Sequence, residues 1–357
     1  MSQRVIVGMS GGVDSSVAAA LLIEQGYEVI GVTMRLWTLH DGDALPTKQQ
    51  CCSVEDVDDA VAVAQTLGIS HYVMNFEREF NEKVVDYFVD EYARGRTPNP
   101  CLACNEHIKY RALFDRAVAL DAAFLATGHY ARVQQTPERA KLLRAVDDAK
   151  DQSYVLYTLG QTELRRLLLP IGEQTKPEVR RIAARHALPV ADKPDSNEIC
   201  FVPNNDYRTF LAERLPQRAG ALVDVTSGAT VGEHGGSAGY TVGQRKGLGA
   251  FGERRYVVGI DAPTNVVLIG DESALLSRTV TATRLRFTSG HAPDVPLRIY
   301  AKIRYKSAPA PATLQIERDT ATVTFDEPQR AVTPGQALVF YDQDEVLGGG
   351  TIERSAP

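Results

Sequence analysis

The chain has 357 residues, of which 44% are hydrophobic and 24% are charged, and its formal net charge is −6. This length predicts two or three domains, and the composition is that of a folded globular protein with no apolar run long enough to span a bilayer. The acidic balance argues against diffuse binding of polyanions, and five unevenly spaced cysteines argue against a secreted disulfide scaffold, so we expect a reducing cytoplasm.

The N-terminal segment predicts a strand, a tight loop and a helix. The apolar run Val5-Ile-Val stops at Gly8, and a helical pattern begins at Val13 after Met-Ser-Gly-Gly. Glycines let the backbone approach an anion, and amides at the start of a helix point outward at its positive end, so the loop predicts a phosphate site. It lacks both the lysine of a Walker loop and the spacing of a dinucleotide fingerprint. Asp14 also suits the positive end of a helix without any ligand.

Strands and helices alternate through the first 200 residues. Repeated units of this kind predict a doubly wound parallel sheet, in which ligands bind beyond the carboxyl ends of the strands. Met34 and Gly128 stand at or just after two such ends, so they are expected beside the phosphate loop. The apolar patterns predict further strands over 27–34, 71–75 and 123–127 and helices over 54–67, 77–93 and 108–120.

After about residue 205 the helical patterns largely disappear. Short alternating runs between glycine-rich turns predict a small antiparallel barrel or sandwich at the C-terminus. We therefore expect an α/β domain over 1–205, a β-rich central domain over 206–272 and an antiparallel β-barrel over 273–357. Residues 247–252 match G-x-G-x-x-G, but a strand-like run follows them and no strand precedes them, so a dinucleotide site is not expected there.

Three cysteines stand in segments that suggest chemistry. Cys101 and Cys104 form a C-x-x-C pair behind Pro98 and Pro100, which predict an extended lead-in to a helix that resumes near residue 105. A thiol at a helix start is stabilised as its thiolate and is therefore nucleophilic. The pair alone is consistent with dithiol redox chemistry, half of a zinc site, part of an iron–sulfur site or coincidence. Cys200 is the remaining candidate partner, whereas Cys51 and Cys52 are interpreted as structural.

The string Ser10-Gly-Gly-Val-Asp-Ser15 resembles the signature of the PP-loop ATP pyrophosphatases, which cleave ATP between its α and β phosphates. Across nearly the whole chain the motifs are similar to those of the tRNA-specific 2-thiouridylases. These enzymes replace the C2 oxygen of the wobble uridine in certain tRNAs with sulfur. The motifs are the PP-loop, Cys51-Cys-Ser53, Thr97-Pro-Asn-Pro100 with Cys104-Asn105, Thr127-Gly-His-Tyr130, Lys150-Asp-Gln-Ser-Tyr154, Ser196-Asn-Glu-Ile-Cys-Phe201, Gly239-Tyr-Thr-Val-Gly-Gln-Arg-Lys-Gly-Leu248, Ala301-Lys-Ile-Arg-Tyr305 and Pro334-Gly-Gln336.

The resemblance implies a role for each matching position. Cys104 would be the nucleophile that faces the base, and Cys200 would carry a persulfide. Asn99, Pro100 and Cys101 would line the pocket for the target base. The ATP-binding residues would be Gly8, Met9, Ser10, Gly11, Gly12, Val13, Asp14, Ser15, Met34 and Gly128. The tRNA contacts would be His129, Lys150, Asp151, Gln152, Arg304, Tyr305 and Gln336.

Cys101 departs from a pattern common in the family, where many members have an aspartate that could act as a general acid or base. If the fold brings them together, Cys101, Cys104 and Cys200 could hold a [4Fe–4S] cluster and leave one iron open to sulfide. The alternative is a persulfide on Cys200, with Cys104 forming a disulfide as the sulfur leaves. The persulfide route is slightly favoured.

The resemblance implies a reaction with ATP, Mg²⁺ and tRNA. Transfer of AMP to the C2 oxygen would make it a good leaving group, with release of pyrophosphate, and a sulfur nucleophile would then displace AMP. The wobble nucleotide would be flipped out of its stack, and a sulfur-donor protein would supply the sulfur. Two other functions remain open: a PP-loop ligase for a small substrate, and an RNA-binding protein that uses ATP as a switch.

Overall fold

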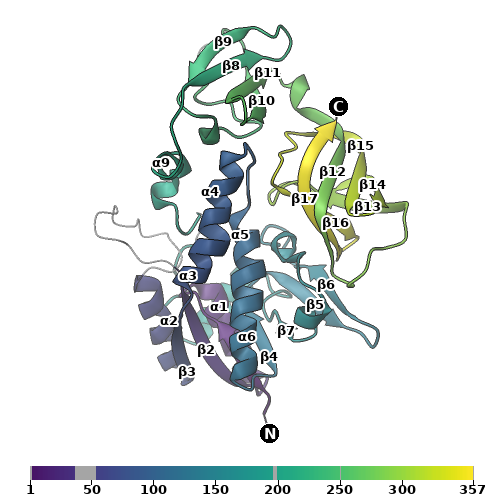
Figure 1. The fold of residues 1–357 in the computed structure, drawn as a ribbon. Coiled ribbons are helices and arrows are strands. Elements are labelled where there is room, and N and C mark those ends of the chain that lie inside the picture. The colour runs from purple at the N-terminus through teal and green to yellow at the C-terminus, as the bar shows by residue number, and fades with distance from the viewer. Residues whose placement is uncertain (1, 37–53, 196–198, 250, 357) are drawn as a thin grey trace.

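The computed structural model describes residues 2–36, 54–195, 199–249 and 251–356. In this part of the chain the strands form three sheets, of five, four and eight strands. The five-stranded sheet and its helices occupy the lower part of Figure 1, the four-stranded sheet lies at the top, and the eight-stranded sheet lies to the right. Across these residues no helix has both the length and the apolar character needed to cross a membrane.

The first sheet confirms the expected doubly wound parallel arrangement. Its strand order is β3-β2-β1-β4-β7, and every neighbouring pair is parallel. The order changes direction between β1 and β4, where Gly8 is the register partner of Thr127, and ligands bind at such switch points. Val5, Ile6 and Val7 of the central strand β1 are fully buried, as expected for a parallel strand that helices cover on both faces. The strands are β1 (Arg4–Gly8), β2 (Glu28–Arg35), β3 (Ser70–Asn75), β4 (Phe124–Thr127) and β7 (Leu167–Leu168).

The helices follow the expected ranges with two differences. The expected helix over 77–93 contains a π-helical segment, η1, in its middle. The helix that carries the cysteine pair begins at Pro100, not near residue 105, because proline is tolerated in the first turn and Asn99 caps it. The helical elements of this region are α1 (Val13–Glu24), α2 (Val54–Leu67), α3 (Glu77–Phe80), η1 (Asn81–Val85), α4 (Asp86–Ala93), α5 (Pro100–Ala103), η2 (Cys104–Ala112), α6 (Leu113–Ala119), η3 (Ser153–Leu156), α7 (Gln161–Leu164), α8 (Lys176–Arg185), η4 (Pro203–Asn205) and α9 (Tyr207–Ala212).

The second sheet is small and has the order β10-β11-β8-β9. Its core is formed by Leu222, Val257, Val267 and Ile269, all at most 3% exposed. Residues 247–249, 251 and 252 lie before β10, which is the next regular element of the chain. The elements are β8 (Gly220–Asp224), β9 (Thr230–His234), η5 (Ser237–Gly239), β10 (Tyr256–Asp261) and β11 (Val266–Gly270).

The third sheet contains the expected C-terminal antiparallel β-barrel, which closes because β12 pairs with both β15 and β17. An unexpected hairpin from the first half of the chain extends this sheet, since β6 pairs with β17. The α/β domain and the barrel therefore share a sheet. The strands are β5 (Ala131–Gln135), β6 (Ala140–Arg144), β12 (Leu276–Phe287), β13 (Leu297–Lys302), β14 (Ala310–Glu317), β15 (Thr320–Arg330), β16 (Ala337–Asp342) and β17 (Glu345–Ala356), and η6 (Ser273–Leu275) precedes them.

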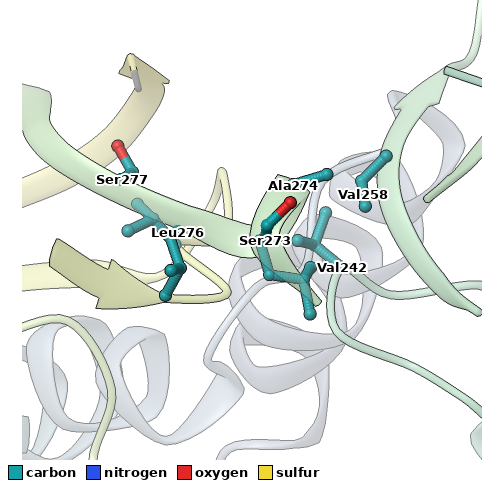
Figure 2. A pocket seen from close by; sticks show the side chains of 8 residues that line it. Val242, Val258, Ser273, Ala274, Leu276 and Ser277 are labelled. Carbon is teal, nitrogen blue, oxygen red and sulfur yellow. The ribbon is translucent and has the colours of Figure 1, made fainter. Parts of the chain in front are cut away.

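A cavity of about 370 Å³ lies where the second sheet meets the barrel. Figure 2 shows side chains from a loop, from β10 and from the start of β12 around it. Its lining is apolar apart from Ser273 and Ser277 and contains no charged side chain. None of the lining residues belongs to the phosphate loop or to the cysteine segments, so we regard this cavity as packing space between domains.

Candidate active site

The predicted phosphate loop connects β1 to α1. Gly11 has a φ of +69°, and a Cβ there would lie 2.2 Å from the Asp56 carbonyl oxygen, so both the backbone conformation and the space require glycine. Gly12 precedes α1 and supplies no capping side chain. The amides of the first helical turn have no acceptors within the helix, so they remain suited to an anion. The Ser15 hydroxyl closes the loop by accepting a 3.1 Å hydrogen bond from the Ser10 amide.

The carboxyl ends of three neighbouring strands meet at this loop. A Cβ on Gly128, just after β4, would lie 2.4 Å from the amide nitrogen of Ser15, so only glycine permits this approach. Met34 lies near the end of β2 and is 9% exposed. Next to it, the Thr33 hydroxyl donates a 2.9 Å hydrogen bond to the Met9 carbonyl oxygen. The structure therefore brings Gly128 against the start of α1, whereas Met34 is linked to the loop only through its neighbour Thr33. That Met34 and Gly128 border a nucleotide stays a prediction.

Alternating charges surround Asp14 at the start of α1. The Lys176 ammonium lies 2.8 and 2.9 Å from the two carboxylate oxygens of Asp14, and the Tyr130 hydroxyl donates to the same carboxylate at 2.8 Å. Lys176 also pairs with Asp195 at 2.7 Å, and Lys150 binds the other oxygen of Asp195 at 2.7 Å. Burial acts to raise the pKa of Asp195, but hydrogen bonds from the two lysines hold that pKa below its ordinary value.

Sequence analysis did not assign Tyr130, Lys176 or Asp195 to the site. Tyr130 ends the Thr-Gly-His-Tyr motif, so the motif was a usable signal for it. Lys176 stands in the first turn of α8, and nothing in its local pattern indicated that it would contact the phosphate loop.

The segment that leads to Cys200 contacts the predicted phosphate loop through the side chain of Lys193. Lys193 donates a 3.1 Å hydrogen bond to the carbonyl oxygen of Gly11 and pairs with Asp56 of α2 at 2.7 Å. Asp195 is bound by Lys176, as described above. Ser196-Asn-Glu198 lie outside the described residues, as do Cys51-Cys-Ser53.

Cys104 and Cys200 belong to the same apolar region. Cys104 is a buried member of the largest hydrophobic cluster, and the half-buried Cys200 packs against that cluster. Phe201 anchors the Cys200 segment, with its ring centroid 5.3 Å from that of Phe88. Cys101 is exposed.

Among the described residues, no group of three or more histidine, cysteine or acidic side chains is arranged to hold a metal ion. The three thiols are therefore not a preassembled ligand set for a [4Fe–4S] cluster.

The helix that carries Cys104 is joined to the phosphate site by a buried polar cluster. The Tyr110 hydroxyl of η2 lies 3.0 Å from both the Thr127 hydroxyl and Nδ1 of His129, which are 2.8 Å apart. Burial raises the pKa of Tyr110 to about 12. Burial also lowers the pKa of His129 well below its ordinary value, and the charge of Lys109 acts in the same direction. His129 is therefore a neutral residue of the interior in this conformation.

The segment before Cys101 is the meeting point of the three domains. The Thr97 amide donates a 2.9 Å hydrogen bond to the Pro334 carbonyl oxygen of the barrel. The Thr97 hydroxyl donates to the Thr241 hydroxyl of the central domain at 3.4 Å. The Gln336 amide group donates to the carbonyl oxygens of Thr97 and Pro98, at 2.8 and 3.2 Å. Barrel and central domain thus both hold the segment that leads into Asn99, Pro100 and Cys101.

Three more predicted tRNA contacts have side chains occupied by hydrogen bonds within the α/β domain. Asp151 accepts from the amides of Ala145 and Ser153, at 3.1 and 3.2 Å, and is 6% exposed. Gln152 accepts from the Tyr130 amide at 2.9 Å. Lys150 pairs with Asp195, as described above.

Arg304 and Tyr305 follow β13 of the barrel. The Arg304 guanidinium donates to the carbonyl oxygens of Val242 and Ala331, at 3.0 and 2.8 Å, and so connects the central domain to the barrel. Tyr305 is half-buried, and its ring meets that of Tyr154 at a centroid distance of 6.1 Å. The structure thus gathers His129, Lys150, Asp151 and Gln152 on the α/β domain, and Arg304, Tyr305 and Gln336 on the barrel side of the domain junctions.

Comparison with known proteins gives matches along almost the whole chain. Three family descriptions match in order: "tRNA methyl transferase HUP domain" over residues 3–204, "tRNA methyl transferase PRC-barrel domain" over 208–271 and "Aminomethyltransferase beta-barrel domain" over 277–352. The tRNA-specific 2-thiouridylase MnmA of Carboxydothermus hydrogenoformans is 53% identical over 360 residues, covering 99% of this chain and 98% of that protein. The protein of the same name from Clostridioides difficile is 47% identical over 361 residues and covers 99% of each chain.

Solved structures give weaker matches. A 4-thiouridine synthetase in complex with RNA and ATP has a TM-score of 0.36 and 15% identity, covering 59% of this chain and 50% of the other. A predicted subunit of tRNA methyltransferase from Methanocaldococcus jannaschii has a TM-score of 0.32 and 18% identity, covering 51% of this chain and 74% of the other.

Proposed function

The chain belongs to the family of tRNA-specific 2-thiouridylases, and we propose that it catalyses the ATP-dependent 2-thiolation of the wobble uridine in tRNA. One observation carries the proposal: the segments of both candidate thiols are bonded to the phosphate site. Tyr110, on the helix of Cys104, contacts Thr127, and Lys193, before Cys200, contacts Gly11. ATP chemistry and sulfur chemistry would then take place in one site.

The first step we propose is adenylation of the C2 oxygen of uracil. ATP would lie with its phosphates on the amides and hydroxyls of residues 8–15, with Met34 and Gly128 bordering the nucleotide. Attack of the C2 oxygen on the α phosphate releases pyrophosphate and leaves AMP on the oxygen. Lys176 would offset phosphate charge, and Mg²⁺ would assist it when bound. Binding of the triphosphate would require Lys176 to divide its hydrogen bonds between the phosphates and Asp14.

The second step we propose is sulfur transfer from a persulfide on Cys200. Its terminal sulfur attacks C2, and AMP leaves with the former C2 oxygen. The Cys104 thiolate then attacks the inner sulfur, which forms a Cys104–Cys200 disulfide and leaves the second sulfur on the base as the 2-thio group. A thiol reductant must reduce that disulfide, and a sulfur-donor protein must reload Cys200. The persulfide route needs only two thiols, and it is supported by the location of Cys104 and Cys200 in the same apolar region.

We propose that tRNA binds across the junction of the three domains, with residues 1–205 as the catalytic part and residues 206–272 and 273–357 as tRNA-binding parts. Asn99, Pro100 and Cys101 would line the base pocket. The predicted tRNA contacts remain His129, Lys150, Asp151, Gln152, Arg304, Tyr305 and Gln336. Hydrogen bonds within the protein occupy several of these side chains. We therefore propose that those residues act by positioning the surface that binds tRNA. The enzyme would work in the cytoplasm, with its tRNA and its sulfur donor.

The test is mass spectrometry of nucleosides from tRNA incubated with the protein, ATP and a sulfide source. We expect 2-thiouridine in the tRNA, with formation of AMP and pyrophosphate that depends on tRNA. ADP and orthophosphate as products would contradict the adenylation step. Formation of AMP with a small substrate in place of tRNA would support a ligase instead.

Cysteine variants separate the two sulfur routes. Cys104→Ser and Cys200→Ser should each abolish thiolation and leave tRNA binding intact. Cys101→Ser should retain thiolation by the persulfide route. Loss of thiolation in all three variants, together with iron in anaerobically purified protein, would favour the cluster.

A further inference from the structure

Lys302, the last residue of β13, is a buried lysine that forms no ion pair with any described residue. It is 6% exposed. Its ammonium lies 5.8 Å from the ring centroid of Tyr154 and 6.0 Å from that of Tyr305. Within the described parts of the chain it has no hydrogen-bond acceptor and no carboxylate within 4.0 Å. Two aromatic faces attract a cation only weakly, so they do not replace an anion.

The nearby carboxylates are already neutralised by other groups. Asp151 accepts hydrogen bonds from two amides and from the Ser153 hydroxyl, and its second oxygen faces Arg144 at 3.7 Å. Asp148 pairs with Arg144 at 2.7 Å. A buried charge is costly unless a partner compensates it. Burial accordingly lowers the pKa of Lys302, and the charge of Asp151 offsets this only in part.

The side chains around Lys302 connect it to the predicted base pocket. Burial raises the pKa of the Tyr305 hydroxyl to about 12, and the neighbouring Asp151 and Cys101 act in the same direction. That hydroxyl therefore stays protonated and can donate a hydrogen bond. An ammonium and a phenol are thus available beside the segment that leads to Cys104.

We propose that Lys302 is an anion site whose occupant is a backbone phosphodiester of the bound tRNA, close to the flipped nucleotide. This inference rests on the proposed function. One ammonium and one neutral donor match the single negative charge of a phosphodiester, whereas a pyrophosphate carries several charges and calls for more cations. The nucleotide also has a cation of its own, because Lys176 lies at the phosphate loop on the α/β domain.

The test is Lys302→Met, which keeps the length of the side chain and removes its charge. Because the described residues offer the ammonium no carboxylate and no hydrogen-bond acceptor, we expect the variant to have an equal or higher melting temperature. We expect its affinity for tRNA to fall about tenfold, and the slope of log affinity against log salt to fall by roughly 0.7 to 0.9, as for the loss of one phosphate contact.

The matched control is Lys141→Met, on β6, because Lys141 has a carboxylate partner in Glu345 at 3.0 Å. It should leave tRNA affinity and the salt slope unchanged and lower the melting temperature slightly. Titrations with ATP and with inorganic pyrophosphate should be the same for Lys302→Met and the wild-type protein. A loss of pyrophosphate binding with unchanged tRNA binding would overturn the assignment to RNA.

A lower melting temperature of Lys302→Met together with an unaltered salt slope would make Lys302 a structural residue and overturn the anion site. In that case thiolation by the wild-type protein would still support the proposed function. Failure of the wild-type protein itself to bind tRNA would count against the proposed function and, with it, against an RNA occupant.

Discussion

The backbone amide of Thr97 donates a 2.9 Å hydrogen bond to the carbonyl oxygen of Pro334, which joins the lead-in to the cysteine helix to the C-terminal barrel. The following residue, Gly335, packs closely against the same segment. A Cβ on Gly335 would lie 3.0 Å from the Thr97 amide nitrogen. The position of the predicted base pocket therefore depends on a domain that contributes neither the phosphate loop nor the thiols.

Gln336→Ala tests this dependence. The change removes hydrogen bonds to the carbonyl oxygens of Thr97 and Pro98. We expect the free energy of unfolding to fall by about 1 kcal/mol, and thiolation to fall more than ATP binding does. Chemical denaturation and steady-state thiolation assays measure the two effects. Gln329→Ala is the control, since the Gln329 side chain donates to the carbonyl oxygen of Glu327 in the same strand. Equal losses in both variants would show that the contact does not position the pocket.

Gly128→Ala should abolish ATP binding. The added Cβ would lie 2.4 Å from the Ser15 amide nitrogen and 2.6 Å from the Asp14 carbonyl carbon, so the first turn of α1 must move. Calorimetric titration with ATP measures the loss, which we expect to exceed tenfold. Gly235→Ala is the control, because nothing lies within 4 Å of its Cβ position. Retention of wild-type affinity in Gly128→Ala would remove Gly128 from the nucleotide site.

The lowered pKa of His129 makes the free energy of unfolding depend on pH. Burial holds its pKa in the folded protein well below 6.5, so the unfolded chain binds a proton more readily than the folded one. Its contribution to stability is therefore complete above about pH 6.5 and is lost as the pH falls below that value, at up to about 1.4 kcal/mol per pH unit. Burial also lowers the pKa values of the half-buried His71 and of the buried His234 in the central domain, and both act in the same sense.

Denaturation of the wild-type protein and of His129→Asn between pH 5 and 8 isolates the contribution of His129. The variant should be less stable at pH 8 but should lose less stability on acidification. Identical slopes for the two proteins would mean that His129 is not buried as a neutral side chain.

A substitution at Arg304 tests whether this residue connects two domains or contacts a phosphate of the tRNA. Arg304→Ala should weaken tRNA binding and leave ATP binding unchanged, because the guanidinium holds the central-domain loop at Val242 against the barrel at Ala331. As an indirect effect, this loss should leave the salt slope of tRNA binding nearly unchanged. Arg78→Ala, at a side chain that is 81% exposed, is the control. A slope reduced by nearly one unit would instead identify Arg304 as a direct phosphate contact.

The parallel sheet and the conformation of the glycine loop after β1 were predictable because their signals are local. The apolar strand before Gly8 and the glycines after it are adjacent in sequence. Gly128 follows β4, which is also apolar and pairs with β1 so that Thr127 opposes Gly8. The start of the cysteine helix was misjudged because two prolines suggested an extended chain, whereas Asn99 caps a helix with Pro100 in its first turn.

Other features depend on contacts between distant segments, and local patterns do not reveal such contacts. Glycines 348–350 resemble a turn, yet they lie inside β17, where Cβ atoms would meet backbone of the neighbouring strands, as at 2.1 Å from the Arg286 carbonyl oxygen. The ion pair of Asp14 with Lys176 likewise joins two distant stretches of the chain. The occupied side chains of Asp151 and Gln152 follow from the turn that residues 150–154 adopt, which a motif cannot specify.

The hairpin of β5 and β6 completes its pairing with β17, where Leu143 opposes Glu345 and the Arg144 amide donates to the Asp344 carbonyl oxygen at 2.8 Å. During synthesis on a ribosome, the hairpin must therefore wait for β17, the last of the described strands, to emerge. A release of the chain before that point leaves an open strand edge beside the catalytic part, which is a route to aggregation. Truncation after residue 272 should consequently yield insoluble protein rather than a working ATP-binding fragment.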